Sequence, residues 1–264
     1  MFIGTDAIQT FKLTLKHDLT IIQDENEANL TCFEIEEDKQ IEKCNLDHIE
    51  DSRRNLLQQK LIQNSKIFSK TKYDIGKTKI DECKIKLINE DLITVQKPYR
   101  TNIVDQRRIE EIIDQLIENK LIEESYSPFS APVALVNKKD DGDKSRLVVN
   151  YKKLNDNVVT DSYPFPRIED IIDKTLDCRY FTTLDVNSAF WTVQVRPEDR
   201  HKLAFVTTNG HFQWCVMPFG FKNALAVFQR ILSSALKKHK LTLFCSNYMD
   251  DILIKLFMQF PLLG

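Results

Sequence analysis

Residues Leu243–Ile254, LFCSNYMDDILI, decide the fold. The flanking segments Leu243–Cys245 and Ile252–Ile254 are short and apolar, as the strands of a covered sheet are. Asn247, Asp250 and Asp251 stand between them, and asparagine and aspartate tolerate tight turns. The stretch therefore predicts a β-hairpin with two adjacent carboxylates at its tip.

The hairpin alone leaves two interpretations of this acidic tip open. It is either a solvated polar turn or a site that binds a cation. Side chains alternate across a strand, so Asp250 and Asp251 point to opposite faces unless the turn re-aims one of them. Tyr248 and Met249 precede the acids and no glycine relieves the turn, which disfavours a simple surface turn.

A third carboxylate lies in a second predicted strand. Phe181–Phe190 (FTTLDVNSAF) is rich in β-forming residues and contains Asp185, and Trp191–Val195 (WTVQV) alternates like a further strand. Asp185 can then face the hairpin tip across a sheet, and three converging carboxylates repel one another unless divalent cations lie between them. Two ions about 3.5–4 Å apart stabilise both oxygens of an in-line phosphoryl displacement. Oxygen-only ligands favour Mg²⁺ or Mn²⁺ over Zn²⁺.

Four ordered blocks of the sequence resemble reverse transcriptases. They are LDVNSAF at Leu184–Phe190, VMPFGFKNA at Val216–Ala224, FQR at Phe228–Arg230 and YMDD at Tyr248–Asp251. The phrases YPFPRIEDI, RPEDRHKLAF and MPFGFKNA look most similar to gypsy-type long-terminal-repeat retrotransposons. The resemblance covers roughly residues 68–255 and rests on several motifs in the family's order.

The resemblance implies an RNA-directed DNA polymerase whose catalytic residues are Asp185, Asp250 and Asp251. Asp185 and Asp250 would bind two Mg²⁺ ions, with Mn²⁺ as the alternative metal. The backbone carbonyl of Val186 and the Asp251 carboxylate would assist them. A primer 3′-hydroxyl would then attack the α-phosphate of an incoming deoxynucleotide and expel pyrophosphate.

The resemblance also implies a nucleotide pocket with Phe190 as a steric gate. An aromatic ring at this place excludes a ribose 2′-hydroxyl, so the expected product is DNA. The alternative for Phe190 is an ordinary core aromatic. Gly220 and Phe221 fall in the block that lines the nucleotide and template pocket. Their alternative is a tight turn before a helix that is expected to begin near Asn223.

Residues 133–149 predict a β-hairpin with a charged, glycine-containing tip. The resemblance places Arg146 and Lys138 over the triphosphate, where a guanidinium or an ammonium suits phosphate oxygens. A solvated loop is the alternative, since three aspartates partly offset the cations of the loop. Lys222 and Arg230 are further candidates for phosphate contacts on template or primer, with plain solubility as their alternative.

Two positions depart from the pattern of the family. Leu225 stands where the family has a proline at the start of a helix. Proline supplies geometry there and no chemistry, so the change is expected to be tolerated. Asn150 stands where the family has an aspartate, which removes a charge near the nucleotide site and bears on catalytic efficiency.

Composition sets limits but excludes few functions. The chain of 264 residues suffices for one large domain or about two smaller ones. A net charge of −2 does not predict a nucleic-acid binder, although a cleft can concentrate positive charge locally. The six cysteines form no C-x-x-C pair, which fits reduced thiols and no zinc site. We expect no signal peptide and no membrane association.

The expected fold is α+β: the fingers and palm of the right-hand polymerase fold, with the thumb absent. The expected divisions are a retropepsin remnant (1–20), a partly helical linker (21–67), fingers (68–165), a truncated palm (166–258) and a tail (259–264). The remnant is inferred from the block FIGTDAI, and no Asp-Ser/Thr-Gly triplet occurs, which excludes protease activity. One helix is expected from Asp51 to near Lys70. A clearer one spans Asp105–Asn119, with an apolar stripe at i, i+3, i+4, i+7 and i+8.

We therefore expect the reverse transcriptase domain of a retrotransposon Pol polyprotein, inactive as this fragment alone. Its expected partners are an RNA or DNA template with primer, deoxynucleotides, and the thumb, RNase H and integrase of the same polyprotein. The expected location is a retroelement particle in the cytoplasm. One alternative is a non-catalytic nucleic-acid-binding or interaction remnant of a degraded retroelement. Another is a palm-fold nucleotidyl cyclase, against which the order of the motifs argues.

Overall fold

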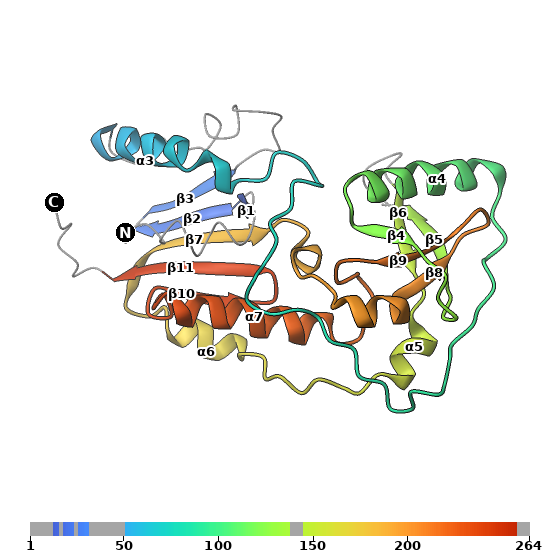
Figure 1. Cartoon of the computed structure of the whole chain (residues 1–264). Coiled ribbons are helices and arrows are strands. Elements are labelled where there is room, and N and C mark those ends of the chain that lie inside the picture. The colour runs from blue at the N-terminus through green and yellow to red at the C-terminus, as the bar shows by residue number, and fades with distance from the viewer. Residues whose placement is uncertain (1–12, 16–17, 24–25, 32–50, 138–144, 258–264) are drawn as a thin grey trace. The chain divides into compact units, whose positions relative to one another are not determined.

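The computed structural model describes residues 13–15, 18–23, 26–31, 51–137 and 145–257. The fold is α+β, as the sequence predicts (Figure 1). The chain divides into two compact units, each built from separate segments. Unit 1 comprises residues 1–80, 163–189 and 228–264, and unit 2 comprises residues 81–162 and 190–227.

Within the described part of unit 1, the main sheet has four strands in the order β1-β7-β11-β10, all antiparallel. A separate hairpin pairs β2 with β3. Strand β3 falls in the stretch predicted as a linker. It forms there as the antiparallel partner of β2, whose sequence is rich in β-branched residues. The strands are β1 (Leu13–Leu15), β2 (Asp18–Gln23), β3 (Asn26–Thr31), β7 (Cys178–Val186), β10 (Cys245–Tyr248) and β11 (Asp251–Phe257).

The predicted acidic hairpin is present with shifted bounds. Strand β10 begins at Cys245 and not at Leu243, whose side chain is exposed. Asn247, which the sequence placed in the turn, is a buried residue of β10. The turn therefore consists of Met249 and Asp250 alone.

Helix α7 (Ala224–Lys238) begins in unit 2 and continues in unit 1, and its start agrees with the predicted one. Apolar residues at i, i+3, i+4, i+7 and i+8 make one face of it. The buried members of this face in unit 1 are Phe228, Ile231, Leu232, Ala235 and Leu236. Unit 1 also contains α3 (Asp51–Gln63), the 3₁₀ helix η1 (Ser65–Ile67) and α6 (Ile168–Asp173).

The helix predicted from Asp51 to near Lys70 ends earlier than expected. It stops at Gln63, and the Asn64 side chain donates to the carbonyl oxygen of Lys60 at 2.8 Å. A short polar amide competes for backbone carbonyls in this way and terminates helices. A single 3₁₀ turn then follows.

A buried lysine fastens strand β11 to the end of α6. Lys255 is buried in β11, and its Nζ donates to the carbonyl oxygen of Lys174 at 2.7 Å. Lys174 is the C-cap residue of α6, so the amine satisfies a carbonyl at the end of the helix. Burial lowers the pKa of Lys255 below its ordinary value.

Within the described part of unit 2, a five-stranded sheet has the order β4-β9-β8-β5-β6. The β5–β8 pairing is parallel and joins residues 131–132 to residues 205–206. It helps to explain why residues 190–227, assigned to the palm by the sequence, cluster with residues 81–162. The strands are β4 (Ile122–Glu124), β5 (Ala131–Asn137), β6 (Ser145–Val149), β8 (Ala204–Val206) and β9 (His211–Trp214). The helices are α4 (Ile103–Glu118), α5 (Lys152–Asn157), η2 (Ala189–Thr192) and η3 (Pro197–Leu203).

Helix α4 confirms the clearest helix prediction. The Asn102 side chain caps its start by accepting from the backbone N–H of Asp105 at 2.7 Å. Ile117, the last residue of the predicted stripe, is exposed, so the buried face is narrower than expected. The buried residues of the helix are Ile109, Ile113 and Leu116.

The prediction of a strand at Trp191–Val195 is wrong. Its first residues belong to η2, and the N–H of Val193 donates to the carbonyl oxygen of Phe190 at 3.1 Å, which closes a tight turn. Isolated bridges follow at Gln194 and Val195. The alternation in the sequence reflects burial of the two valines and not a strand ladder.

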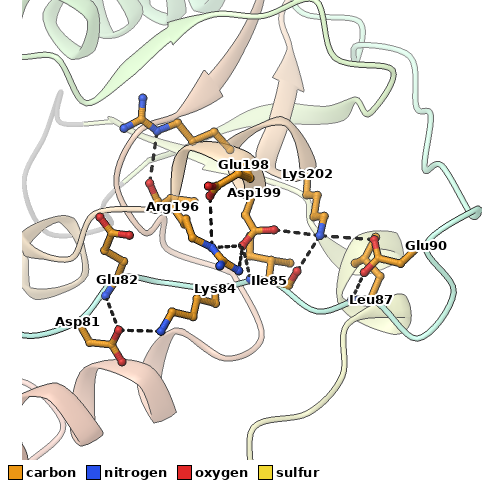
Figure 2. A network of polar contacts seen from close by, with 12 residues as sticks. Asp81, Glu82, Lys84, Ile85, Leu87, Glu90, Arg196, Glu198, Asp199 and Lys202 are labelled. Carbon is orange, nitrogen blue, oxygen red and sulfur yellow. Dashed lines mark hydrogen bonds and ion pairs between the residues drawn. The ribbon is translucent and has the colours of Figure 1, made fainter.

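A buried ionic network ties an extended segment of unit 2 to η3 (Figure 2). Asp199 is only 4% exposed, and its carboxylate accepts from the N–H of Ile85 at 3.0 Å and from Lys202 Nζ at 3.0 Å. Lys202 Nζ also donates to the carbonyl oxygen of Ile85 at 2.8 Å, and Arg196 lies 3.4 Å from the carboxylate. Burial acts to raise the pKa of Asp199, but the hydrogen bonds from Ile85 and Lys202 hold it below its ordinary value.

The cysteines of the described residues are free. They are all buried, and burial raises the pKa of Cys83 to about 12, which keeps that thiol protonated. Across the same residues, no helix has both the length and the apolar character needed to cross a bilayer.

Candidate active site

A two-residue turn positions two of the candidate catalytic acids. Tyr248 pairs with Asp251, so Met249 and Asp250 form the turn between β10 and β11. Met249 has a φ of 55°, in the left-handed region that such turns normally fill with glycine or asparagine. The turn places Asp250 at the tip of the hairpin and Asp251 at the first position of β11.

The strand register brings two of the acids face to face. Asp251 in β11 is the direct cross-strand partner of Asp185 in β7. The N–H of Val186 donates to the carbonyl oxygen of Asp250 at 3.2 Å, which makes the aspartates a non-hydrogen-bonded pair. Such pairs have Cα atoms about 4.5 Å apart and side chains on the same face. The structure thus places Asp185 opposite the hairpin tip.

The chain that leaves β7 is fastened close to Asp185. Asn187 Nδ2 donates to Ser69 Oγ at 2.6 Å and to the carbonyl oxygen of Thr71 at 3.1 Å. Ser188 follows with a φ of 46°, so the chain turns sharply away from the sheet. These contacts limit the movement of the strand end that carries the first acid.

The donor chemistry of the site fits a hard divalent cation. Like charges directly opposite each other destabilise an antiparallel pair, and a cation between them removes the repulsion. Asp185, Asp250 and Asp251 are all partly exposed and offer only oxygen donors, the ligands of Mg²⁺ and Mn²⁺. Among the described residues, no three His, Cys, Asp or Glu side chains are gathered as a metal site. The structure therefore pairs Asp185 with Asp251 and leaves Asp250 at the adjoining turn.

Phe190, the candidate steric gate, lies in unit 2 in a partly exposed aromatic cluster. Its ring centroid is 5.1 Å from that of Phe219, which is 53% exposed. Trp191 contacts the same Phe219 ring edge-on at 5.7 Å. Phe190 itself is only half-buried, which weakens the alternative of an ordinary core aromatic.

The Gly220 loop is a pinned turn. Gly220 has a φ of 84°, and its carbonyl oxygen accepts from Asn155 Nδ2 at 2.9 Å. The N–H of Lys222 donates to Asn155 Oδ1 at 2.9 Å, so one amide holds both ends of the loop. Phe221 between them is buried, which favours core packing over contact with a base. Gly220 is exposed, and the absence of a side chain leaves its backbone open to close approach.

The two strands of the hairpin predicted at residues 133–149 are present in unit 2, and the charged tip lies outside the described residues. Strands β5 and β6 pair in register from Val133 with Val149 to Asn137 with Ser145. Arg146 is exposed and is the second residue of β6, close to the segment that connects the two strands. Lys138 lies outside the described residues.

The two further phosphate-binding candidates have partners within the protein. Lys222 Nζ donates to the carbonyl oxygen of Val158 at 3.0 Å. The guanidinium carbon of Arg230 lies 4.9 Å from the ring centroid of Tyr163, a cation–π contact. Both side chains thus make contacts that stabilise the local structure. Neither the phosphate-binding role nor plain solubility had predicted these contacts.

The two departures from the family pattern have local structural explanations. Leu225 lies in the first turn of α7, which forms without a proline. Asn150 Oδ1 accepts from the N–H of Lys152 at 3.1 Å, at the start of α5, and its Nδ2 donates to Tyr99 Oη at 2.7 Å. Asn150 therefore accepts from the first backbone N–H of α5 and donates to a tyrosine hydroxyl.

Sequence reasoning assigned no role to Gln229, although it touches the acidic turn. Gln229 is 2% exposed, and its Oε1 accepts from the N–H of Met249 at 3.0 Å. The available signal was a polar residue beside the apolar face of a helix, within the FQR block.

An antiparallel sheet with carboxylates on neighbouring strands, next to an acidic turn held by a helix, fits the palm expected for a polymerase-type nucleotidyltransferase. Residues 136–257 match the family model described as reverse transcriptase (RNA-dependent DNA polymerase). These residues are therefore a reverse transcriptase domain, of the kind found in retroelement Pol polyproteins.

Curated relatives share the domain at moderate identity. The chain is 38% identical over 165 residues to the Retrovirus-related Pol polyprotein from transposon 297 of Drosophila melanogaster, covering 60% of this chain and 15% of the relative. It is 34% identical over 192 residues to the Enzymatic polyprotein of cauliflower mosaic virus (strain Strasbourg), covering 72% of this chain and 28% of the relative. The chain thus spans less than a third of either relative.

Solved structures share the fold. The foamy viral protease-reverse transcriptase in complex with an RNA/DNA hybrid superposes with a TM-score of 0.71 at 21% identity, covering 89% of this chain and 31% of that one. The selenomethionine-labelled CSH mutant of the prototype foamy virus enzyme gives a TM-score of 0.66 at 23% identity, covering 78% and 27%. These likenesses confirm the predicted α+β fingers and palm architecture.

Proposed function

We propose that this chain is the RNA-directed DNA polymerase part of a gypsy-type Pol polyprotein, adding deoxynucleotides to a primer 3′-hydroxyl with two Mg²⁺ ions. The observation that carries the proposal is the cross-strand pair of Asp185 and Asp251 beside the Asp250 turn. The domain match over residues 136–257 and the similarity to a Drosophila transposon polyprotein support it.

The proposal extends to the surroundings of the domain. The substrates are deoxynucleotides and an RNA or DNA template with its primer. The thumb, RNase H and integrase regions of the same polyprotein are the partners. Residues 1–20 are the end of a retropepsin, a proposal that rests on the block FIGTDAI. The site of action is a retroelement particle in the cytoplasm.

The acids would bind the metals in distinct ways. Asp185 and Asp250 would bind both ions, and Asp251 and the backbone carbonyl of Val186 would assist. When bound, Mg²⁺ lowers the pKa of the attacking hydroxyl and stabilises charge on the phosphate that is transferred. The protein presents its carboxylates from two adjacent strands, whose backbone hydrogen bonds fix the spacing. No side chain serves as nucleophile, because the attacking oxygen belongs to the primer.

Primer extension on an RNA template tests the proposal. The purified 264-residue chain is assayed with Mg²⁺ and with Mn²⁺, alone and joined to the thumb region of a related Pol polyprotein. We expect template-dependent incorporation in the longer form. Incorporation by the chain alone would support the proposal and correct the expectation of inactivity. Primer–template binding without extension in either form would contradict the proposal and favour the non-catalytic remnant.

Phe190→Val is expected to admit ribonucleotides. Removing the ring opens space for a 2′-hydroxyl, and the ratio of ribonucleotide to deoxynucleotide kcat/KM is expected to rise on the order of 10- to 200-fold. Single-nucleotide extension with each substrate measures the ratio. Phe219→Leu is the control, because it alters the neighbouring exposed ring and is expected to leave the ratio within about twofold. Equal shifts in both variants would contradict the gate.

Arg146→Ala is expected to weaken nucleotide binding. Loss of a charge-assisted hydrogen bond to the triphosphate costs about 1.5–3 kcal/mol, so the nucleotide KM is expected to rise at least about tenfold with little change in kcat. Steady-state extension kinetics measure both constants. Lys153→Ala removes an exposed cation from the same unit and should leave the nucleotide KM unchanged. A lower kcat at unchanged KM would contradict this role of Arg146.

A further inference from the structure

The side-chain amide of Gln229 contacts the acidic hairpin with both of its ends. Oε1 accepts from the N–H of Met249 at 3.0 Å, and Nε2 donates to the carbonyl oxygen of Asn247 at 3.4 Å. Gln229 is 2% exposed, its contact with Asn247 is buried, and its contact with Met249 is partly buried. One side-chain amide therefore bonds the last part of β10 and the first residue of the turn.

The turn needs such support because of its residues. Two-residue hairpin turns place a residue at positive φ, and Asn-Gly or Asp-Gly pairs are the usual solution. Here Met249 has a φ of 55°, a conformation that is unfavourable for a side chain with a Cβ. An unpaired N–H at this partly buried site would add a further penalty. The hydrogen bond from Met249 to Gln229 offsets both costs.

The conformation of Met249 determines where the acids lie. Asp250 follows it directly, and the Asp250 carbonyl oxygen is fixed by the N–H of Val186 at 3.2 Å. Asp251 is the next residue and stands opposite Asp185. A different turn conformation would shift the register of β11 and move its side chains to the other face.

A second polar contact between α7 and β10 is weaker and lies further from the acids. Ser233 Oγ bonds Asn247 Oδ1 at 3.4 Å. Asn247 Nδ2 is buried with no hydrogen-bond partner among the described residues. The Asn247 side chain is therefore only partly satisfied, and the contact that reaches the turn itself is that of Gln229.

We infer that Gln229 is a positioning residue, which holds Met249 in the left-handed conformation and thereby sets Asp250 and Asp251 against Asp185. The inference deepens the proposed function and rests on it where metal binding and activity are concerned. Whether Gln229 stabilises the turn can be measured without metal binding and without activity.

Amide hydrogen exchange in the full chain tests the hold. In Gln229→Met the side chain keeps its length and loses both polar groups, and exchange at the Met249 amide is expected to accelerate about tenfold or more. Gln229→Glu keeps an oxygen acceptor and is expected to restore much of the protection. Ser234→Ala, at an exposed residue of the same helix, is expected to leave the Met249 amide unchanged. Wild-type exchange at Met249 in both Gln229 variants would overturn the inference.

Binding of Mn²⁺, measured by electron paramagnetic resonance, tests the effect on the acids. We expect the Kd to rise at least about tenfold in Gln229→Met and to stay within about twofold in Ser234→Ala. In primer extension, kcat is expected to fall by about 10- to 100-fold with the nucleotide KM nearly unchanged. Faster Met249 exchange with unchanged Mn²⁺ affinity would overturn the positioning role. If wild-type protein neither binds Mn²⁺ nor extends primers, the proposed function fails, and exchange still decides whether Gln229 holds the turn.

Discussion

Asp185→Asn is expected to reduce nucleotide incorporation on the order of 10³-fold. Metal ions contribute several kcal/mol of charge stabilisation in phosphoryl transfer, and each 1.36 kcal/mol is a factor of ten in rate. Asparagine keeps the shape of the side chain but removes one of the two opposed charges of the Asp185–Asp251 pair. The loss should therefore appear in kcat at saturating nucleotide, measured by primer extension in a form of the chain that incorporates nucleotide.

Asp177→Asn is the matched control. It makes the same change of charge at an exposed residue just before the other end of β7 and should retain wild-type activity. The dependence of the melting temperature on Mg²⁺ is a second measurement, and it distinguishes metal binding from a purely structural role of Asp185. Without metal, Asp185→Asn should be at least as stable as wild type, because it relieves repulsion between opposed carboxylates. Wild-type Tm should rise with added Mg²⁺ while that of Asp185→Asn should not. Equal activity losses in the two variants, or equal responses to Mg²⁺, would contradict the metal-binding role.

The acidic hairpin could be predicted because its information is local. Two apolar segments around Asp250 and Asp251 specify strands and a turn, and the structure has both. The placement of Asp185 across from them followed from its place in a second strand. Helix α4 was predictable for the same reason, since its apolar stripe and Asn102 cap lie within one stretch of sequence.

Errors arose where one sequence pattern fits two structures. Alternating apolar residues at Trp191–Val195 suit a strand, but here a 3₁₀ turn and isolated bridges bury them. Asn247 is a residue type common in turns, yet β10 extends through it because the strand is paired as far as Tyr248. Neither distinction is available without the partner segments.

The contacts that tie distant segments together could not be predicted from the sequence at all. Gln229 meets Met249 across 20 residues of chain, and Asp199 meets Ile85 across 114. Both are buried polar groups that would cost stability if unpaired, so each depends on a partner that periodicity does not reveal. The pairing of β5 with β8, which draws residues 190–227 into unit 2, is a third case.

Asp199→Asn is expected to destabilise unit 2 by about 3 kcal/mol, because it breaks a buried ion pair and leaves Lys202 with a single, exposed acidic partner. The side chain of Lys202 is buried too, and its remaining acidic neighbour, Glu90, is exposed and 3.5 Å away. Asparagine can still accept from the N–H of Ile85, so the loss reports mainly the charge. For a domain stabilised by about 5–15 kcal/mol, such a loss is a large fraction.

The effect should depend on pH in a defined direction. The pKa of Asp199 is lowered in the folded protein, through its hydrogen bonds from Ile85 and Lys202, despite the opposing effect of burial. A carboxylate with a depressed pKa stabilises the fold above its unfolded value of about 3.9, and this contribution is lost as the pH falls through the folded value. The difference in stability between wild type and Asp199→Asn should therefore be full at pH 7 and shrink below about pH 4.

Tryptophan fluorescence restricts the measurement of unfolding to unit 2. The chain contains two tryptophans, and Trp191 and Trp214 both belong to unit 2. Urea unfolding followed by their emission therefore reports unit 2 even where the other unit unfolds separately.

Glu198→Gln is the matched control, because Glu198 is the adjacent residue, is 74% exposed and pairs with the same Arg196 at 3.4 Å. An exposed pair contributes about 0–1 kcal/mol, so the control should lie near wild type at every pH. If Asp199→Asn cost no more than Glu198→Gln at pH 7, the buried network would not be what holds the segment around Ile85 to η3.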